Sequence, residues 1–404
     1  MNKLYISQIN IIRFAAAVWI VVFHQSGPTA LLGQVLSKAP DFIFNIVRTG
    51  YVGVNIFFLI SGFVLSYNYI ENADSLKKRS FFVARFARIY PVYLLGWLVA
   101  APFVVRNAFT SGDLSSQPGK IMIDGLSSLL LLHAWLPNSA LSWNAPSWAI
   151  SCEFFFYLSF PFFAILVNKL KPSKLLLGII AMWLLSLLVP SITALVSLDW
   201  IGRLPARGMP FNQFVNLPAT ELPMGLWPQL IKFNPILRLP EFLIGIMLGR
   251  LFLLRRDFAV RIPRAVVYGS LFLGGLSLIV VFCGIMSRII YYPIFHNGFL
   301  SIFIAIMLYG VASDNGFFKK LLEAPFLVRL GDLSYALFVL HYPVYSWMYW
   351  LDTHSVNLTK TNPFLHFFLY LAVTITLSTL TFYLIEEPSR KFIRRTLQSE
   401  TVNS

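Results

Sequence analysis

Ten long apolar stretches divide this chain, and they constrain its fold more than any other feature. Each is close to the length of about 20 residues that a helix needs to cross about 30 Å of hydrocarbon. Only 12% of the residues are charged, about half the usual share in a soluble domain, which excludes a water-soluble enzyme. We therefore expect an all-α fold, a polytopic membrane bundle of about ten transmembrane helices. The stretches lie near 6–25, 49–70, 89–106, 146–168, 174–197, 238–254, 265–286, 291–312, 330–350 and 364–386.

The connecting segments differ in charge on the two sides of the expected bundle. If the stretches cross in turn, 21 lysines and arginines lie on the side of the N-terminus and ten on the other side. Because cytoplasmic loops carry the basic excess in membrane proteins, both termini are expected in the cytoplasm. This asymmetry also accounts for the net charge of +15. The basic residues are too dispersed to indicate a nucleic-acid partner.

Three further segments are expected not to cross. Segment 122–136 is apolar but short, and a crossing there would reverse every later loop, so we expect it to be re-entrant or to lie along the outer interface. Segments 26–48 and 198–237 are expected outside. Residues 1–390 then form one integral-membrane domain, followed by a short cytoplasmic tail at 391–404.

Ionisable residues inside apolar stretches are the first candidates for a functional site, because each is costly to insert in a membrane. Arg13 and His24 are eleven residues apart, so they lie on one helix face with about 16 Å between them along the axis. Taken singly, Arg13 is also compatible with an interfacial anchor and His24 with an interfacial residue. Their shared face favours a functional pair.

Two polar residues of other stretches are expected at the depth of His24. Asn55 lies in the second stretch and Glu153 lies about 10 Å inside the fourth. A carboxylate or an amide beside an imidazole fixes its tautomer, which a general base requires. Glu153 is alternatively a structural partner of Arg238 or of another buried donor.

Arg85 and Arg88 share a helix face at the cytoplasmic entry of the third stretch. Guanidinium groups bind phosphate oxygens in pairs, so the two arginines are candidates for a phosphorylated ligand, although anchors of this kind are common in membrane proteins. In the ninth stretch, Asp332 is expected to start the helix and His341 to form a hydrogen bond in the core.

Five motifs, in order, resemble those of the membrane-bound acyltransferase 3 family, and the resemblance runs from the N-terminus to Pro388. Arg13 and His24 match its arginine, ten residues, histidine motif. The second stretch matches its FFxxSGF pattern over residues 57–63. The other matches are Arg85, Arg88 and Pro91 for the paired arginines, then Trp148, Ile150, Glu153, Phe156 and Tyr157 in the fourth stretch, and Gly331, Ser334, Tyr335 and His341 in the ninth. Ile150 replaces a usual leucine, and Phe338 stands where a tyrosine is common.

The resemblance implies an acyltransferase that moves an acyl group, usually acetyl from acetyl-CoA, to a hydroxyl of a carbohydrate or a related acceptor. Arg13, Arg85 and Arg88 would then bind CoA, and His24 would act as the general base or as a transient acyl carrier, held by Glu153 and Asn55. No metal is implied. Residues near the outer ends of the fourth and sixth stretches are candidates for acceptor binding: Trp143, Asn144, Trp148, Tyr157 and Glu241.

Some members of this family carry an extra SGNH-type esterase domain. The residues after Lys391 are too few for such a domain, so we expect the membrane unit itself to deliver the acyl group. A lipid-linked or nascent polysaccharide, such as an exopolysaccharide or an O-antigen, fits best as the acceptor. The expected location of the protein is a bacterial inner membrane. The sequence does not indicate an oligomeric state.

Two alternatives stay open at this point. A transporter of a sugar or an anionic substrate would also place polar residues at the midplane, although the sequence has no inverted repeat and such a reading leaves the arginine pair without a ligand. The other alternative is an acyltransferase that acts on a small hydrophobic molecule such as a macrolide.

Overall fold

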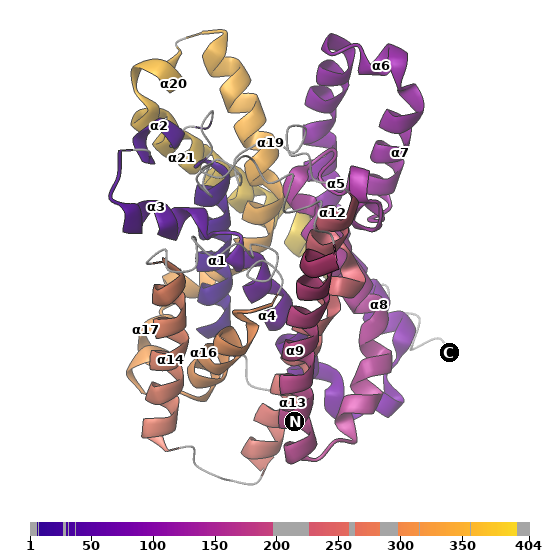
Figure 1. Cartoon of the computed structure of the whole chain (residues 1–404), viewed down its shortest axis with the longest axis vertical. Helices are drawn as coiled ribbons and strands as arrows, with labels where there is room; N and C mark the ends of the chain where they lie inside the picture. The colour runs from indigo at the N-terminus through magenta and orange to yellow at the C-terminus, as the bar shows by residue number, and fades with distance from the viewer. Residues whose placement is uncertain are drawn as a thin grey trace.

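The computed structural model describes residues 6, 8–26, 30, 32–36, 38–196, 226–257, 263–282, 298–314, 316–355 and 357–393. Throughout these residues the regular structure is helical, with no strand (Figure 1). The all-α class expected from the apolar stretches is therefore confirmed.

Every expected stretch contains an α-helix. These helices are α1 (Gln8–His24), α4 (Val52–Tyr69), α5 (Lys78–Thr110), α8 (Trp148–Asn168), α9 (Pro172–Val196), α13 (Pro235–Asp257), α14 (Arg264–Phe282), α16 (Ser301–Ser313), α19 (Ser334–Thr353) and α21 (Pro363–Thr381). Shorter α-helices connect them: α2 (Gly33–Leu36), α3 (Asp41–Arg48), α6 (Asp113–Ser116), α7 (Pro118–Leu129), α12 (Leu226–Phe233), α17 (Phe317–Leu322), α18 (Pro325–Asp332) and α20 (Leu358–Thr361).

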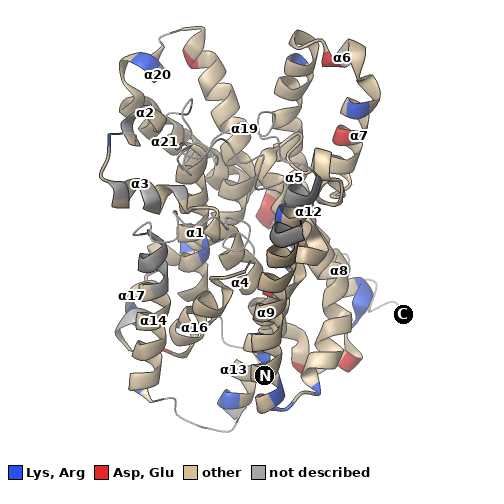
Figure 2. Ribbon diagram, viewed as in Figure 1, with Lys and Arg blue, Asp and Glu red and all other residues tan. Residues whose placement is uncertain are grey.

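Five helical segments in the described part of the chain are long and apolar enough to cross a membrane: Val52–Ser75, Lys78–Thr110, Ala145–Asn168, Pro172–Ile192 and Pro363–Ile393. The full count of ten crossings and the cytoplasmic position of both termini stay predictions. Large apolar side chains remain exposed along the outer faces of α9 and α21, where lipid would cover them. Figure 2 shows the charged residues mainly toward the two ends of the bundle.

Two boundaries differ from expectation, and the start of the eighth stretch lies outside the described residues. Helix α5 begins at Lys78, so Arg85 and Arg88 lie well inside a 33-residue helix and not at its start. Asp332 ends α18, and α19 begins at Ser334, so Asp332 does not start the helix of the ninth stretch. In the eighth stretch, residues 291–297 lie outside the described residues and α16 begins at Ser301.

Segment 122–136 turns back along α5. Helix α7 has 12 residues and is about 18 Å long, which is too short to cross the hydrocarbon. The Tyr93 hydroxyl donates to the carbonyl of Ser128 at 2.6 Å, and Tyr90 donates to the carbonyl of Leu129 at 3.3 Å. The segment is therefore held against α5, and its re-entrant or interfacial position in the membrane stays a prediction. Of the two other segments expected outside, 198–225 lies beyond the described residues, whereas much of 26–48 forms α2 and α3.

Helix α4 lies at the centre of the core, and α13 packs directly against its backbone. A Cβ atom on Gly245 would meet the carbonyl oxygen of Leu59 at 2.2 Å, and one on Gly62 would meet that of Phe242 at the same distance. Only glycine permits this approach, which is a common way for membrane helices to pack. The close contact positions the polar side chains that these two helices carry.

A buried ionic cluster joins the same two helices to α8. The Arg238 guanidinium donates to Asn55 Oδ1 at 2.8 Å and lies 3.0 Å from Glu241 Oε2. It also lies over the rings of Phe58 and Trp148, at 5.4 and 5.7 Å from their centroids. All polar members of the cluster are fully buried, so Arg238 orients α13 against α4 and α8.

Candidate functional site

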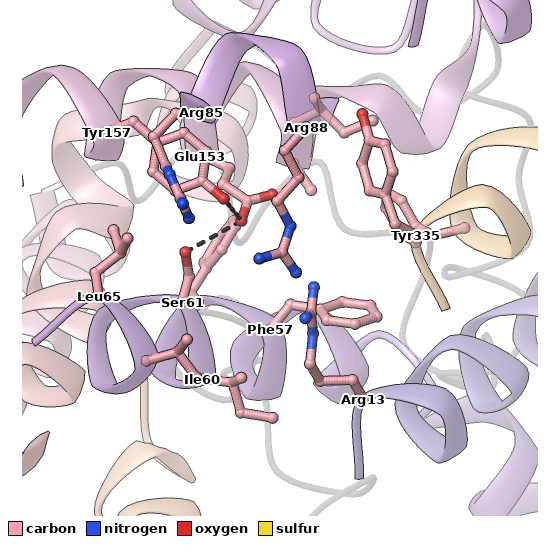
Figure 3. Close-up of a pocket in the computed structure, with 15 residues that line it drawn as sticks. Arg13, Phe57, Ile60, Ser61, Leu65, Arg85, Arg88, Glu153, Tyr157 and Tyr335 are labelled. Atoms are coloured by element: carbon pink, nitrogen blue, oxygen red, sulfur yellow. Dashed lines mark hydrogen bonds between the residues drawn. The ribbon is translucent and has the colours of Figure 1, made fainter. Parts of the chain in front are cut away.

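The arginines of the first and third stretches meet in one cavity. Arg13 comes from α1, and Arg85 and Arg88 come from neighbouring turns of α5. Figure 3 shows the guanidinium groups of Arg13 and Arg88 facing each other across this cavity. Two like charges in one cavity repel, so their arrangement favours an anion between them.

Arg85 is held by aromatic rings from three sides. Its guanidinium donates to the Tyr69 hydroxyl at 3.1 Å and lies over the rings of Tyr69, Phe81 and Tyr157, at 5.5 to 6.0 Å from their centroids. Its Nε atom is buried and makes no hydrogen bond to any described residue. A buried donor of this kind has capacity left for a ligand oxygen.

Glu153 is the single carboxylate that lines the part of the cavity between α4, α8 and α19. Its Oε1 atom accepts hydrogen bonds from Tyr157 at 2.5 Å and from Ser61 at 3.1 Å (Figure 3). Three guanidinium groups therefore surround this part of the cavity against one carboxylate. The net charge of the side chains around this part is therefore positive, which favours an anionic ligand.

The cavity has a wide part and a narrow part, which share Arg13, Arg85 and Arg88. The wide part measures about 310 Å³ and is bounded by the adjoining ends of α1, α18 and the last helix, where Asp332, Glu386 and Arg390 lie. The narrow part measures about 40 Å³ and reaches between α4, α8 and α19. The last helix widens into a π-turn at Phe382–Glu386, which brings Glu386 to the wide part.

His24 lies at the other end of α1 and pairs with His341 of α19. The Nδ1 atom of His24 is 2.9 Å from the carbonyl oxygen of Ile20 and 3.2 Å from Nε2 of His341. The Nδ1 atom of His341 is 2.7 Å from the carbonyl oxygen of Phe338. His341 is fully buried.

These contacts determine the tautomers of the two neutral rings. A carbonyl oxygen only accepts, so Nδ1 carries the proton in both histidines. The Nε2 atom of His341 then has a lone pair and shares the single Nδ1 proton of His24 with the carbonyl oxygen of Ile20. The Nε2 atom of His24 is left with a free lone pair, and no described residue hydrogen bonds to it. His24 is thus prepared to accept a proton or to attack a carbonyl carbon.

The structure corrects the expected partners of His24. Glu153 lies in the arginine cavity with Ser61 and Tyr157, and Asn55 accepts from Arg238, so neither fixes the imidazole. Glu153 instead accepts from two other side-chain donors, Ser61 and Tyr157, which agrees with the alternative that it is a structural partner of a donor other than Arg238. His341 lies beside His24, in the place that was expected for Glu153 and Asn55. Its position near mid-depth in another stretch was the only indication of this in the sequence. The hydrogen bond expected for it in the core is present, at the carbonyl of Phe338.

The five residues proposed for acceptor binding lie in different places. Tyr157 lines the arginine cavity. The others line neither part of it. Trp143 stacks on Trp97 at 4.5 Å, the Asn144 amide donates to the carbonyl of Val339 at 3.0 Å, and Trp148 and Glu241 belong to the Arg238 cluster. Acceptor binding by these residues stays a prediction.

No group of three or more His, Cys, Asp or Glu side chains that could hold a metal ion occurs in the described part of the chain. The donor set of the cavity, guanidinium and hydroxyl groups, is instead the kind that binds phosphate or carboxylate.

Comparison with known proteins identifies a family for nearly the whole chain. Residues 6–383 match the acyltransferase 3 family model, which is described as an acyltransferase domain. The chain is 30% identical over 341 residues to the acyltransferase MdmB of Streptomyces mycarofaciens, which covers 82% of this chain and 77% of that protein. No solved structure matches the chain.

Two further relatives are named for peptidoglycan. The chain is 23% identical over 410 residues to the peptidoglycan O-acetyltransferase OatA of Listeria monocytogenes, covering 96% of this chain and 56% of OatA. It is 26% identical over 368 residues to the putative peptidoglycan O-acetyltransferase YrhL of Bacillus subtilis, covering 86% of this chain and 51% of YrhL. The chain therefore spans about half the length of these two relatives.

Proposed function

This chain belongs to the acyltransferase 3 family, and from that membership we propose that it transfers a short acyl group from acyl-CoA to a hydroxyl of a cell-envelope carbohydrate or of its lipid-linked precursor. Membership of this family makes the chain a membrane acyltransferase, so the transporter alternative is set aside. The identities of the acyl donor and of the acceptor are what we propose. The observation that supports acyl-CoA as the donor is the cavity in which Arg13, Arg85 and Arg88 converge.

The cavity supports CoA as the donor through its charge and shape. CoA carries several phosphate groups on a bulky nucleotide and a slender pantetheine arm that ends in the thioester. The wide part would take phosphates beside the three arginines, and the narrow part would take the end of the arm. Acetyl-CoA would be the usual donor, delivered from the cytoplasm.

His24 would perform the chemistry. Its Nε2 lone pair takes the proton of the acceptor hydroxyl, whose oxygen forms a bond to the thioester carbonyl carbon. The carbon–sulfur bond then breaks, and the CoA sulfur leaves with the proton held by His24. In the alternative route, Nε2 attacks the thioester carbon, the carbon–sulfur bond breaks and CoA leaves as the thiolate. The acceptor oxygen then attacks the acyl carbon, the bond to Nε2 breaks, and the hydroxyl proton passes to the thiolate. His341 would keep Nδ1 of His24 protonated in both routes.

A carbohydrate acceptor is favoured by the relatives that are named peptidoglycan O-acetyltransferases. The cell location would be the bacterial inner membrane, with transfer at its outer face. The identity to MdmB keeps a small-molecule acceptor, such as a macrolide, as the second candidate.

The test is acetyl-CoA binding and turnover by the purified protein in nanodiscs, with muropeptides, a lipid-linked oligosaccharide or a macrolide as the acceptor. His24→Ala is expected to abolish turnover and to retain acetyl-CoA binding, because it removes the base without touching the arginine cavity. The double variant Arg85→Ala/Arg88→Ala is expected to lose binding.

Two matched controls separate these effects from general damage. Arg79→Ala removes an exposed arginine of the same helix α5 that lines neither part of the cavity, and His354→Ala removes an exposed histidine. Both are expected to behave as the wild type. Failure of the wild type to bind acetyl-CoA, or full turnover by His24→Ala, would contradict the proposal.

A further inference from the structure

Two phenylalanines lie between the arginine cavity and the histidine pair. Along α19, Tyr335, Phe338 and His341 follow one another at intervals of three residues and so lie close to one face. Tyr335 lines the cavity, and His341 contacts His24. Phe338 lies midway, about 4.5 Å along the helix axis from each. An acyl group that moved along α19 from the cavity toward His24 would meet its ring.

Phe57 of α4 faces Phe338 across this passage. Their ring centroids are 5.5 Å apart in an edge-to-face arrangement, and the Phe338 ring lies 5.9 Å from the ring of His341. Phe338 is only 5% exposed, and Phe57 packs against both hydrophobic clusters of the core. The two rings are therefore held in place by packing.

The space beside the two rings is small. Phe57 and Phe338 both line the narrow part of the cavity, which measures about 40 Å³ against about 310 Å³ for the wide part. One water molecule needs about 10 to 15 Å³ on this measure, so the narrow part has room for about three. A short acyl group fits such a space, whereas a longer one has to displace the packed rings.

We propose that Phe57 and Phe338 select the length of the transferred acyl group and restrict the donor to short-chain acyl-CoA, with acetyl-CoA preferred. The inference rests on the proposed function, because it takes the donor to lie in the arginine cavity and the transfer to occur at His24. Selection arises from the steric barrier of two apolar rings and needs no hydrogen bond to the acyl group.

The experiment uses permeabilised native membranes from a strain that lacks the gene and is complemented with each variant. The membranes receive an equimolar mixture of acetyl-CoA, propionyl-CoA and butyryl-CoA, and mass spectrometry follows the consumption of each thioester. Activity of the strain without the gene is subtracted. Phe338→Leu and Phe57→Leu are expected to raise the butyryl-to-acetyl ratio about tenfold, the effect typical of a methylene in an apolar pocket.

Phe242→Leu is the matched control. Phe242 is a fully buried phenylalanine of α13 that stacks on Phe156 at 4.7 Å and lines neither part of the cavity. The control is expected to keep the acetyl preference of the wild type. A changed preference in this control would attribute the effect to general loosening of the core and would overturn the assignment.

The remaining outcomes distinguish this inference from the function on which it rests. If the wild type consumes acetyl-CoA and both leucine variants keep its chain-length profile, the two phenylalanines do not select and the inference fails alone. If the wild type consumes none of the three thioesters, the proposed function fails and the inference fails with it.

Discussion

His24 depends on a partner that is distant in the chain. The contact between His24 Nδ1 and His341 Nε2 joins residues 317 positions apart, and it leaves His24 Nε2 free for chemistry. Removal of His341 deletes one of the two acceptors of the His24 Nδ1 proton and leaves only the carbonyl of Ile20, so the imidazole is held less firmly. Loss of His341 should therefore change the geometry of the His24 imidazole and leave the binding of acyl-CoA unchanged.

We therefore expect His341→Ala to lower kcat by about 10- to 100-fold, the size of effect typical of groups that orient a reacting histidine. The KM for acetyl-CoA is expected to change little. His341→Gln retains an oxygen that can accept from His24 Nδ1, so it should recover part of the rate. Steady-state kinetics of the purified protein measure both parameters.

The control for this prediction is His133→Ala, because His133 is equally buried but contacts Ser147 at 3.1 Å and lines neither part of the cavity. Equal loss of kcat in the control, or a rise in KM without loss of kcat in His341→Ala, would show that His341 does not position His24.

The contact between α4 and α13 depends on glycine at several positions, and Gly245 is one of the two with the closest approach. A methyl group there would lie 2.2 Å from the carbonyl oxygen of Leu59, and that backbone atom cannot move without separating the helices. Gly245→Ala is expected to destabilise the protein by about 1 to 3 kcal/mol. A thermal melt in detergent would record this as a lower Tm.

Gly269→Ala provides the comparison, since a Cβ atom on Gly269 of α14 meets nothing within 4 Å. Alanine has the higher helix propensity, so this variant should melt at the same temperature as the wild type or slightly above it. Equal melting of the two variants would mean that α4 and α13 are not in close backbone contact.

The connection from α19 to α21 is organised by Asp352. Its carboxylate accepts from the backbone N–H groups of Leu358 and Thr359 at 2.5 and 2.8 Å and from the Thr359 hydroxyl at 2.6 Å. It also lies 3.5 Å from Nδ1 of His366 on α21. One side chain thus ties α20 to the two long helices.

Asp352→Ala removes these acceptor atoms and should lower the local stability by about 1 kcal/mol, because half-buried donors lose their partners. Hydrogen exchange is expected to accelerate in the 357–366 segment and to stay unchanged in α4. Asp113→Ala, in which an exposed carboxylate bonded to Ser111 is lost, should leave that segment protected. Unchanged exchange in Asp352→Ala would refute this role.

The whole bundle is predicted to sit in the membrane with its more basic end in the cytoplasm. Ser173 and Ser355 are both exposed and lie on opposite predicted sides. In a background with Cys152 and Cys283 replaced, a maleimide that cannot cross membranes should label Ser355→Cys in intact cells and Ser173→Cys only after lysis. Labelling of both after lysis confirms that each variant is present. The reverse pattern in intact cells would invert the topology.

Much of this architecture could be predicted from the sequence because its causes are local. The length and apolarity of each stretch predict a helix at that position, since an unpaired backbone is too costly in hydrocarbon. The spacing of Arg13 and His24 places both on one face of α1 through helix geometry alone. The paired arginines on α5 are likewise a property of one helix, and the structure adds that Arg13 joins them in one cavity.

The contacts between helices could not be predicted in this way, because helix rotation and depth depend on packing over the whole bundle. The glycine contact of α4 and α13 brings Asn55 to Arg238 instead of His24, and the arrangement of α4 and α8 brings Glu153 to Ser61. Local sequence therefore determined which residues enter the membrane as helices and share a face. Only the tertiary packing decided that His341 contacts His24. It also decided that the rings of Phe57 and Phe338 lie between the arginine cavity and this histidine pair.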